Sequence, residues 1–233
     1  MPGPGPEHAM REAGAVTVAL EGFHAVKHAL RFAPDLVVRV TVRSMTATAA
    51  LAAELAPDIS DRLLAVAVEG AVDHPTGVSG TAHRPAYDAS VLSSRVSPLV
   101  VLDDPRHPGN AGAAIRVAAA AGASGLAVVG ALDPWGASVV RGSAGLHFAL
   151  PVLTCLVAEL RGPVLALDAG GTRLGHLPDD AVLVVGSERH GLSPALRERA
   201  DEVVSLPMRA GVSSLNLATA VSAALYAWRL RQP

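Results

Sequence analysis

The sequence predicts an α/β protein in two parts, a C-terminal domain built on a mainly parallel sheet and a smaller α/β domain before it. In the second half of the chain, short apolar runs alternate with helical segments, which is the pattern of parallel strands joined by crossover helices. Residues 70–98 are rich in turn residues and have no regular hydrophobic period, so a boundary falls within them. We therefore predict a disordered tail at 1–14, a first domain at 15–92, a linker at 93–97 and a second domain at 98–233.

Hydrophobic periodicity predicts the elements of the first domain. Between Phe23 and Leu30 the apolar residues recur at helical spacing, and Pro34 ends this helix. The elements that follow are expected to be a strand at 36–42, an alanine-rich helix at 46–57 and a strand at 63–68.

The second domain is predicted from the same signals. A strand at 98–104, a helix that stops at Gly122 and a strand at 125–130 form a right-handed parallel unit. Further strands are expected at 163–169, 181–188 and 202–208, with a polar helix at 193–200. In the last helix one apolar stripe is expected to face the core, formed by Leu217, Val221, Ala224, Leu225 and Trp228.

Composition limits the classes of function. The chain has 233 residues, half of them hydrophobic, and a formal net charge of -2, so any nucleic-acid surface must be a local patch. No stretch reads as a signal peptide or as an apolar run of the roughly 18 residues that a membrane span needs. We therefore expect a soluble, cytoplasmic protein. The single cysteine, Cys155, lies in an apolar run and is expected to be a buried thiol rather than a nucleophile.

Polar residues gather at three places where a predicted strand ends. Asn110 and Arg116 lie in "NAGAAIR", Glu188 lies in "GSERHGLS", and Ser214 and Asn216 open the last helix. Taken singly, each has a structural reading as a helix cap, a solvated helix residue or an exposed turn. Because ligands bind at the carboxyl ends of parallel strands, the three clusters together predict one composite site.

Several common sites are disfavoured. His24 and His28 have the spacing of a helical zinc pair, but the intervening residues lack the glutamate of H-E-x-x-H, so no metal is expected. The chain contains no complete G-x-G-x-x-G fingerprint, no P-loop and no G-x-S-x-G nucleophile elbow.

In this order and on these elements, the clusters resemble the SpoU/TrmH family of RNA ribose 2′-O-methyltransferases, which belong to the SPOUT superfamily. The family's motifs correspond here to "NAGAAIR", "GSERHG" and "LPMRAGVSSLN", and the resemblance covers residues 98–231. The N-terminal half is similar to the small ribosomal-protein-like RNA-binding domain of many members, through "EGFHAVKHAL" and "TGVSGTAHRP". The family usually has Asp-Pro where this chain has His107-Pro108, which puts the RNA contacts at that point in doubt.

The resemblance implies a deep trefoil knot, a homodimer formed through the knotted domain, S-adenosylmethionine as cofactor, and methyl transfer to a ribose 2′-hydroxyl of RNA, with ribosomal RNA favoured over transfer RNA. It assigns the activation of that hydroxyl to Arg116, and Asn110, Glu188, Ser214 and Asn216 to the catalytic site, Ser214 and Asn216 also serving as helix caps. The residues implied to hold the cofactor are Leu167, Asp168, Ala169, Gly186, Ser187, Gly191, Leu206, Met208, Ser214 and Leu215. The residues implied to contact RNA are Arg84, Arg106 and Arg141.

Two rival interpretations remain at this point. One is a non-catalytic RNA-binding protein that retains the knotted fold, against which the intact motif residues argue. The other is a dinucleotide-dependent oxidoreductase with a doubly wound sheet, against which the missing glycine fingerprint argues.

Overall fold

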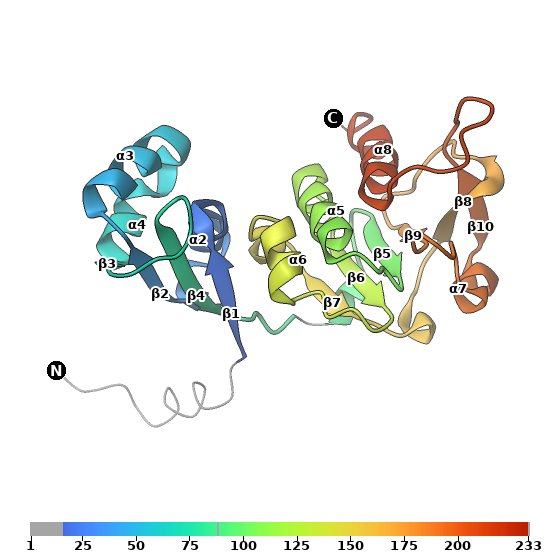
Figure 1. Cartoon of the computed structure of the whole chain (residues 1–233). Helices are drawn as coiled ribbons and strands as arrows, with labels where there is room; N and C mark the ends of the chain where they lie inside the picture. The colour runs from blue at the N-terminus through green and yellow to red at the C-terminus, as the bar shows by residue number, and fades with distance from the viewer. Residues whose placement is uncertain (1–15, 88, 233) are drawn as a thin grey trace, which may run out of the picture. The chain divides into compact units, whose positions relative to one another are not determined.

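The computed structural model describes residues 16–87 and 89–232 and divides into two compact units, Met1–Ala86 and Tyr87–Pro233 (Figure 1). Each unit is built on its own sheet. The tail predicted at 1–14 lies outside the described residues.

The first unit has a four-stranded sheet in the order β1-β4-β2-β3, in which only β2 and β3 pair in parallel. The predicted apolar face of its first helix is confirmed, because Phe23, Val26, Ala29 and Leu30 are all buried. The elements in chain order are β1 (Thr17–Glu21), α2 (Gly22–Phe32), β2 (Val37–Val42), α3 (Met45–Leu55), α4 (Ser60–Val66), β3 (Ala67–Glu69) and β4 (Val78–His83).

Two predictions for this unit were wrong. The strand expected at 63–68 is mostly helix, because α4 runs to Val66 and buries Leu63 on one side while its last residues face solvent. The stretch assigned to irregular structure contains β4, which pairs with both β1 and β2 in the middle of the sheet. β4 is rich in small and polar residues; at Gly80 a Cβ would lie 2.6 Å from the Arg39 carbonyl oxygen, so hydrophobicity could not reveal it.

The division between the units also differs from the prediction. Residues 87–97 belong with the second unit, because a 3₁₀ helix at Ala89–Leu92 buries Val91 and Leu92 in its core.

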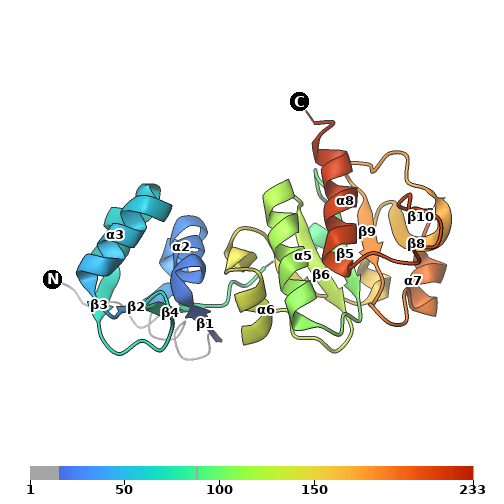
Figure 2. The same ribbon diagram turned by 45° about the horizontal axis from the view of Figure 1, so that its top comes forward.

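The second unit has a six-stranded sheet in the order β10-β8-β9-β5-β6-β7, and every neighbouring pair is parallel. α5 and α8 lie side by side in both views (Figures 1 and 2). Sequence analysis missed α6 and β7, and the trefoil knot stays a prediction. The elements are β5 (Leu99–Asp103), α5 (Pro108–Ala121), β6 (Gly125–Val129), α6 (Ala137–Gly142), β7 (Val152–Thr154), β8 (Val164–Arg173), β9 (Val182–Val185), α7 (Pro194–Arg199), β10 (Glu202–Ser205) and α8 (Leu217–Arg229).

The core of this unit follows the predicted pattern. Every residue of β5 is buried, as expected for a central strand covered on both faces. The stripe predicted on α8 is confirmed, since all five of its apolar residues are buried. α5 ends at Gly122, which has a φ of 77° and forms the left-handed cap expected from the sequence. At Gly112 a Cβ would lie 2.5 Å from the Val139 carbonyl oxygen, so α5 can approach α6 closely only with glycine there.

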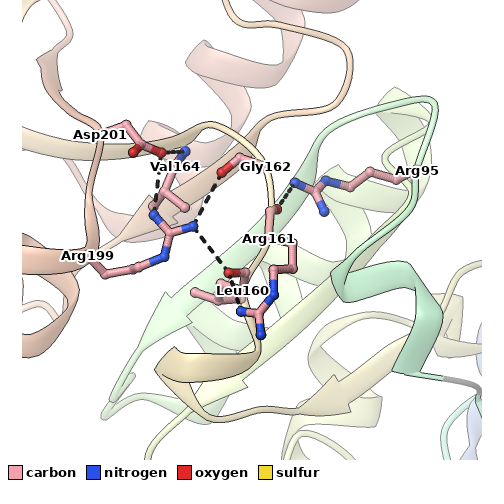
Figure 3. A network of polar contacts seen from close by, with 7 residues as sticks. All are labelled: Arg95, Leu160, Arg161, Gly162, Val164, Arg199 and Asp201. Atoms are coloured by element: carbon pink, nitrogen blue, oxygen red, sulfur yellow. Dashed lines mark hydrogen bonds and ion pairs between the residues drawn. The ribbon is translucent and has the colours of Figure 1, made fainter.

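A group of arginines makes hydrogen bonds around the amino-terminal end of β8 (Figure 3). Arg199 donates to the carbonyls of Leu160 and Gly162 and pairs with Asp201, whose carboxylate accepts the backbone N–H of Val164 at the start of β8. Arg95 donates to the carbonyl of Arg161 from the other side. This scaffold lies at the opposite ends of the strands from the polar motifs.

Candidate functional site

A cavity of about 280 Å³ opens between the middle of β8, the end of β9 and the start of α8. Four of the lining residues were not predicted from the sequence: Val185, Ser213, Leu217 and Ala220. The lining includes all ten residues implied to hold a cofactor: Leu167, Asp168, Ala169, Gly186, Ser187, Gly191, Leu206, Met208, Ser214 and Leu215.

An interruption in β8 forms one wall of the cavity. Ala166 pairs with Val203 of β10, but the next residue of β10, Val204, pairs with Thr172, so Leu167–Gly171 leave that ladder. Gly171 allows β8 to rejoin β10 at Thr172, because any Cβ at Gly171 would lie only 2.6 Å from the Val203 carbonyl oxygen. The chain thereby brings Leu167, Asp168 and Ala169 into the cavity lining, as bulges next to functional sites commonly do.

A tight loop after β9 forms the second wall. Ser187 and Gly191 exchange two backbone hydrogen bonds of 3.0 Å, and Gly191 has a φ of 65°. A Cβ on Gly186 would lie 2.3 Å from the Gly191 carbonyl carbon, so the loop closes only around glycine. Asp103 fixes its far end, since this buried carboxylate at the end of β5 accepts the backbone N–H of Ser193 at 2.5 Å. No pattern in the sequence indicates that role of Asp103.

Three motif residues form one hydrogen-bonded chain. Asn110 Nδ2 donates to Glu188 Oε1 at 2.7 Å, and Asn216 Nδ2 donates to Asn110 Oδ1 at 3.0 Å. Asn216 Oδ1 accepts the backbone N–H groups of Ala218 and Thr219 and so caps α8. The structure therefore joins all three predicted strand-end clusters, as the composite-site hypothesis requires.

Glu188 is held as an anion within this chain. Partial burial would raise the pKa of Glu188, but hydrogen bonds from Asn110 and from the backbone N–H of Arg106, with His107 nearby, leave it below the ordinary glutamate value. Asn110 donates to one oxygen of Glu188 and the Arg106 N–H donates to the other. A protonated glutamate would carry its proton on one of these oxygens, so the charged carboxylate suits this position.

Asp168 is the second carboxylate in the cavity wall. It accepts the backbone N–H of Gly170 at 2.9 Å and is paired with Arg197 of α7. The Gly170 hydrogen bond is the main reason that the pKa of Asp168 lies below its ordinary value; burial opposes it and Arg197 adds to it. Among the residues that line the cavity there is no lysine, arginine or histidine.

Arg116 lies apart from this chain of hydrogen bonds. Its side chain is exposed on α5, and within residues 16–87 and 89–232 no hydrogen bond or ion pair holds its guanidinium. Successive residues of a helix are rotated by about 100° around its axis, so Arg116 lies on the same face of α5 as Gly109 and Gly112, the face toward α6. Asn110 lies on a different face.

One predicted role was wrong. Ser214 lines the cavity, but it is exposed and does not cap the last helix, because Asn216 alone accepts the first free amides of α8. The segment before Asn216 is therefore wall rather than cap.

The predicted RNA contacts are spread over three places. Arg106 follows β5 and pairs with Asp104 at 2.5 Å, Arg141 lies on α6 and donates to Ser138, and Arg84 follows β4 in the first unit. Their contacts to RNA stay predictions.

The remaining sequence candidates lie outside the cavity. Cys155 is a buried free thiol, as predicted, and burial raises its pKa to about 11. Neither His24 nor His28 belongs to a group of three potential metal ligands in the part of the chain that the structure describes. Among the same residues, no helix combines the length and apolarity needed to cross a bilayer.

The sequence of the second unit matches a known family. The family model of the SpoU rRNA Methylase family matches residues 97–226, more than half of the chain. A 23S rRNA (uridine(2479)-2′-O)-methyltransferase of Streptomyces viridochromogenes is 37% identical over an alignment of 170 residues, and the match covers 65% of this chain and 59% of that protein. An uncharacterized tRNA/rRNA methyltransferase of Mycobacterium tuberculosis is 38% identical over an alignment of 156 residues, and the match covers 62% of this chain and 48% of that protein. The match thus spans only about half of these curated relatives' length.

Solved structures match over nearly the whole chain and confirm the predicted α/β fold with its parallel sheet. The SpoU methyltransferase AviRb from Streptomyces viridochromogenes, in complex with the cofactor AdoMet (S-adenosylmethionine), has a TM-score of 0.72 and 26% identity and covers 96% of this chain and 92% of its own. An AdoMet-bound rRNA methyltransferase from Sinorhizobium meliloti has a TM-score of 0.70 and 25% identity, covering 90% of this chain and 85% of its own. With its motifs joined around one cavity, the chain belongs to the SpoU rRNA methylase family.

Proposed function

We propose that this protein transfers a methyl group from S-adenosylmethionine to a ribose 2′-hydroxyl of structured RNA, with ribosomal RNA favoured over transfer RNA. The observation that carries the proposal is the hydrogen-bonded chain Glu188–Asn110–Asn216, which joins the motif at the start of α5 to the two motifs that line the cavity. A relative named as a 23S rRNA 2′-O-methyltransferase supports both the reaction and the ribosomal substrate.

The cavity suits the proposed cofactor chemically. Leu167, Leu206 and Leu217 offer apolar contacts for a flat purine, while main-chain groups around Gly186 and Gly191 can hydrogen-bond to it. The two carboxylates in the wall suit a ligand that carries positive charge. When bound, S-adenosylmethionine supplies an electrophilic methyl group on a sulfonium.

The protein's own residues would then position the acceptor and stabilise charge. A guanidinium has an intrinsic pKa above about 12, so Arg116 is a poor base and acts as a cation. We assign it to an RNA phosphate and to the developing alkoxide on the ribose 2′-oxygen, whose proton passes to phosphate, a neighbouring group or water. Asn110 and Glu188 keep the motif loops in register, and Asn216 fixes the start of α8.

The proposal extends to the protein's assembly and to its first unit. We propose that two copies pair through the second unit, and that the unit before residue 87 binds RNA. Both follow from the family resemblance. Exposed apolar side chains at the end of α8, Tyr226 and Leu230, are consistent with a protein partner there.

The test is methyl transfer from methyl-tritiated S-adenosylmethionine to purified ribosomal RNA and, in a separate reaction, to transfer RNA. We expect label in a 2′-O-methylated nucleotide, recognised because the neighbouring phosphodiester resists alkaline hydrolysis, and more of it in ribosomal RNA. Label on a base would contradict the proposed reaction. RNA binding without any transfer would favour the non-catalytic RNA-binding protein.

A further inference from the structure

We propose that the negative charge of the cavity selects the methylated cofactor over its demethylated product, with Asp168 and Glu188 as the selecting groups and Arg197 as the residue that limits the effect of Asp168. The inference rests on the proposed function and names how its site would distinguish cofactor from product.

The reaction itself changes the charge of the ligand. At neutral pH S-adenosylmethionine carries an ammonium, a sulfonium and a carboxylate, a net charge of about +1 by their ordinary ionisation. On transfer the carbon–sulfur bond breaks and its electron pair stays on sulfur, while a carbon–oxygen bond forms at the ribose and the hydroxyl proton leaves. The product S-adenosylhomocysteine is a neutral thioether with the same ammonium and carboxylate. A cavity of negative potential therefore binds the two ligands differently.

The lining of the cavity carries such a potential. Its only ionisable side chains are two acids, Asp168 in the β8 wall and Glu188 in the loop after β9. Both accept N–H groups, Asp168 from Gly170 and Glu188 from Asn110 and Arg106, which keeps them in the charged form. The lowered pKa of each carboxyl agrees with this geometry.

The two carboxylates differ in how far they are compensated. Asp168 is paired with Arg197, a half-exposed side chain that approaches from α7 and does not itself line the cavity. Glu188 takes part in no ion pair within the described residues; its hydrogen-bond donors are a neutral amide and a backbone N–H, and the His107 side chain lies nearby. Its charge is therefore the less shielded of the two.

The expected effect is modest. Across a water-filled cavity of this size, at separations of roughly 6–10 Å, one unit charge changes the affinity for a cation by about threefold. We therefore expect Glu188→Gln to lower the preference for S-adenosylmethionine over S-adenosylhomocysteine by about threefold, and Asp168→Asn to lower it by less, because Arg197 already offsets the charge of Asp168.

The experiment measures the dissociation constants of both ligands by calorimetry at pH 7.5 and low salt, using the full-length protein. Asp168→Asn and Glu188→Gln remove one charge each with little change of shape, and both should lower the ratio of affinities. Arg197→Gln should raise the ratio, because it removes the cation beside Asp168. Glu198→Gln is the matched control, since Glu198 is an exposed acid on the same helix and outside the cavity.

Opposite changes for Asp168→Asn and Arg197→Gln would support charge selection, because a loss of local structure weakens both ligands together and leaves their ratio unchanged. An unchanged ratio in both carboxylate variants, with both ligands still bound, would overturn the inference and leave the proposed function intact. If the unaltered protein binds neither ligand, the proposed function fails and the inference with it.

Discussion

Asn216 donates a hydrogen bond of 3.0 Å to Asn110 across 106 positions of sequence, and these are the only two asparagines in the chain. The bond joins the start of α8 to the start of α5, and Asn110 passes the connection on to Glu188. Each amide is used at both ends, so neither can be replaced by an acid or an alcohol without losing a partner. The three motifs are therefore joined by hydrogen bonds donated by neutral amides and not by ion pairs.

Replacing Asn216 should separate capping from function. Asn216→Ala removes the cap of α8 and is expected to cost about 1 kcal/mol of unfolding free energy. It should also lower methyl transfer by at least about tenfold, because Asn110 loses its partner. Ser193→Ala is the control, since Ser193 caps α7 with its side chain and forms no part of the chain of asparagines. Denaturant unfolding and methyl-transfer rates of both variants check this; equal losses of activity would contradict it.

The lowered pKa of Glu188 predicts a pH dependence of stability. Its folded-state pKa lies below the unfolded value of about 4.3, so its hydrogen bonds stabilise the fold fully above that value. This contribution should be lost as the pH falls through the folded-state pKa. The difference in unfolding free energy between the unaltered protein and Glu188→Gln should thus be constant from pH 7 to about 5 and shrink below about 4. A difference that grows toward low pH would refute the assignment.

Gly186 provides a steric test of the cavity wall. Gly186→Ala places a Cβ where the Gly191 main chain lies, at 2.3 Å, so the loop after β9 must open. We expect the affinity for S-adenosylmethionine to fall by more than about tenfold. Gly175→Ala is the control, because a Cβ there meets nothing within 4 Å. Calorimetric titration of both variants with S-adenosylmethionine measures this loss. Undiminished binding by Gly186→Ala would show that this loop does not shape the cofactor site.

Arg116 should affect transfer but not cofactor binding. Its side chain is exposed and outside the cavity lining, so Arg116→Ala should leave the affinity for S-adenosylmethionine within about twofold and preserve stability. Methyl transfer should fall by about 100-fold or more if the guanidinium stabilises the developing alkoxide. Arg116→Lys keeps the charge but not the planar fork, and near-full activity in that variant would rule out a bidentate grip. Arg173→Ala serves as the control, because Arg173 is an exposed arginine at the end of β8 and outside the cavity lining.

The sequence predicted the second unit better than the first, for a physical reason. The strands of a parallel sheet are buried on both faces and the stripe on α8 is continuous, so hydrophobicity alone marks them. β4 is a central strand as well, but its six residues include a serine, a glycine, a threonine and a histidine, which carry no such signal. The apolar run at 63–68 is short enough to form either a helix or a strand. In the structure most of it is helical, and the helix buries Leu63.

For the site, the motifs indicated which segments meet but not how. The cavity lining was predicted from the resemblance, whereas the hydrogen bonds from Asn110 to Glu188 and from Asn216 to Asn110 depend on where the chain places residues far apart in sequence. The role of Asp103 was invisible for the same reason, since an acid at a strand end has no pattern that reveals its burial. The departure of β8 from β10 is likewise a matter of pairing and not of composition.

The most direct test of the central claim is a calorimetric titration of the purified protein with S-adenosylmethionine, followed in the same preparation by transfer of a tritiated methyl group to total RNA. Saturable binding at one site per chain, together with label recovered in a 2′-O-methylated ribose, is the predicted result. Failure to bind S-adenosylmethionine in a preparation that is folded by circular dichroism would contradict the account.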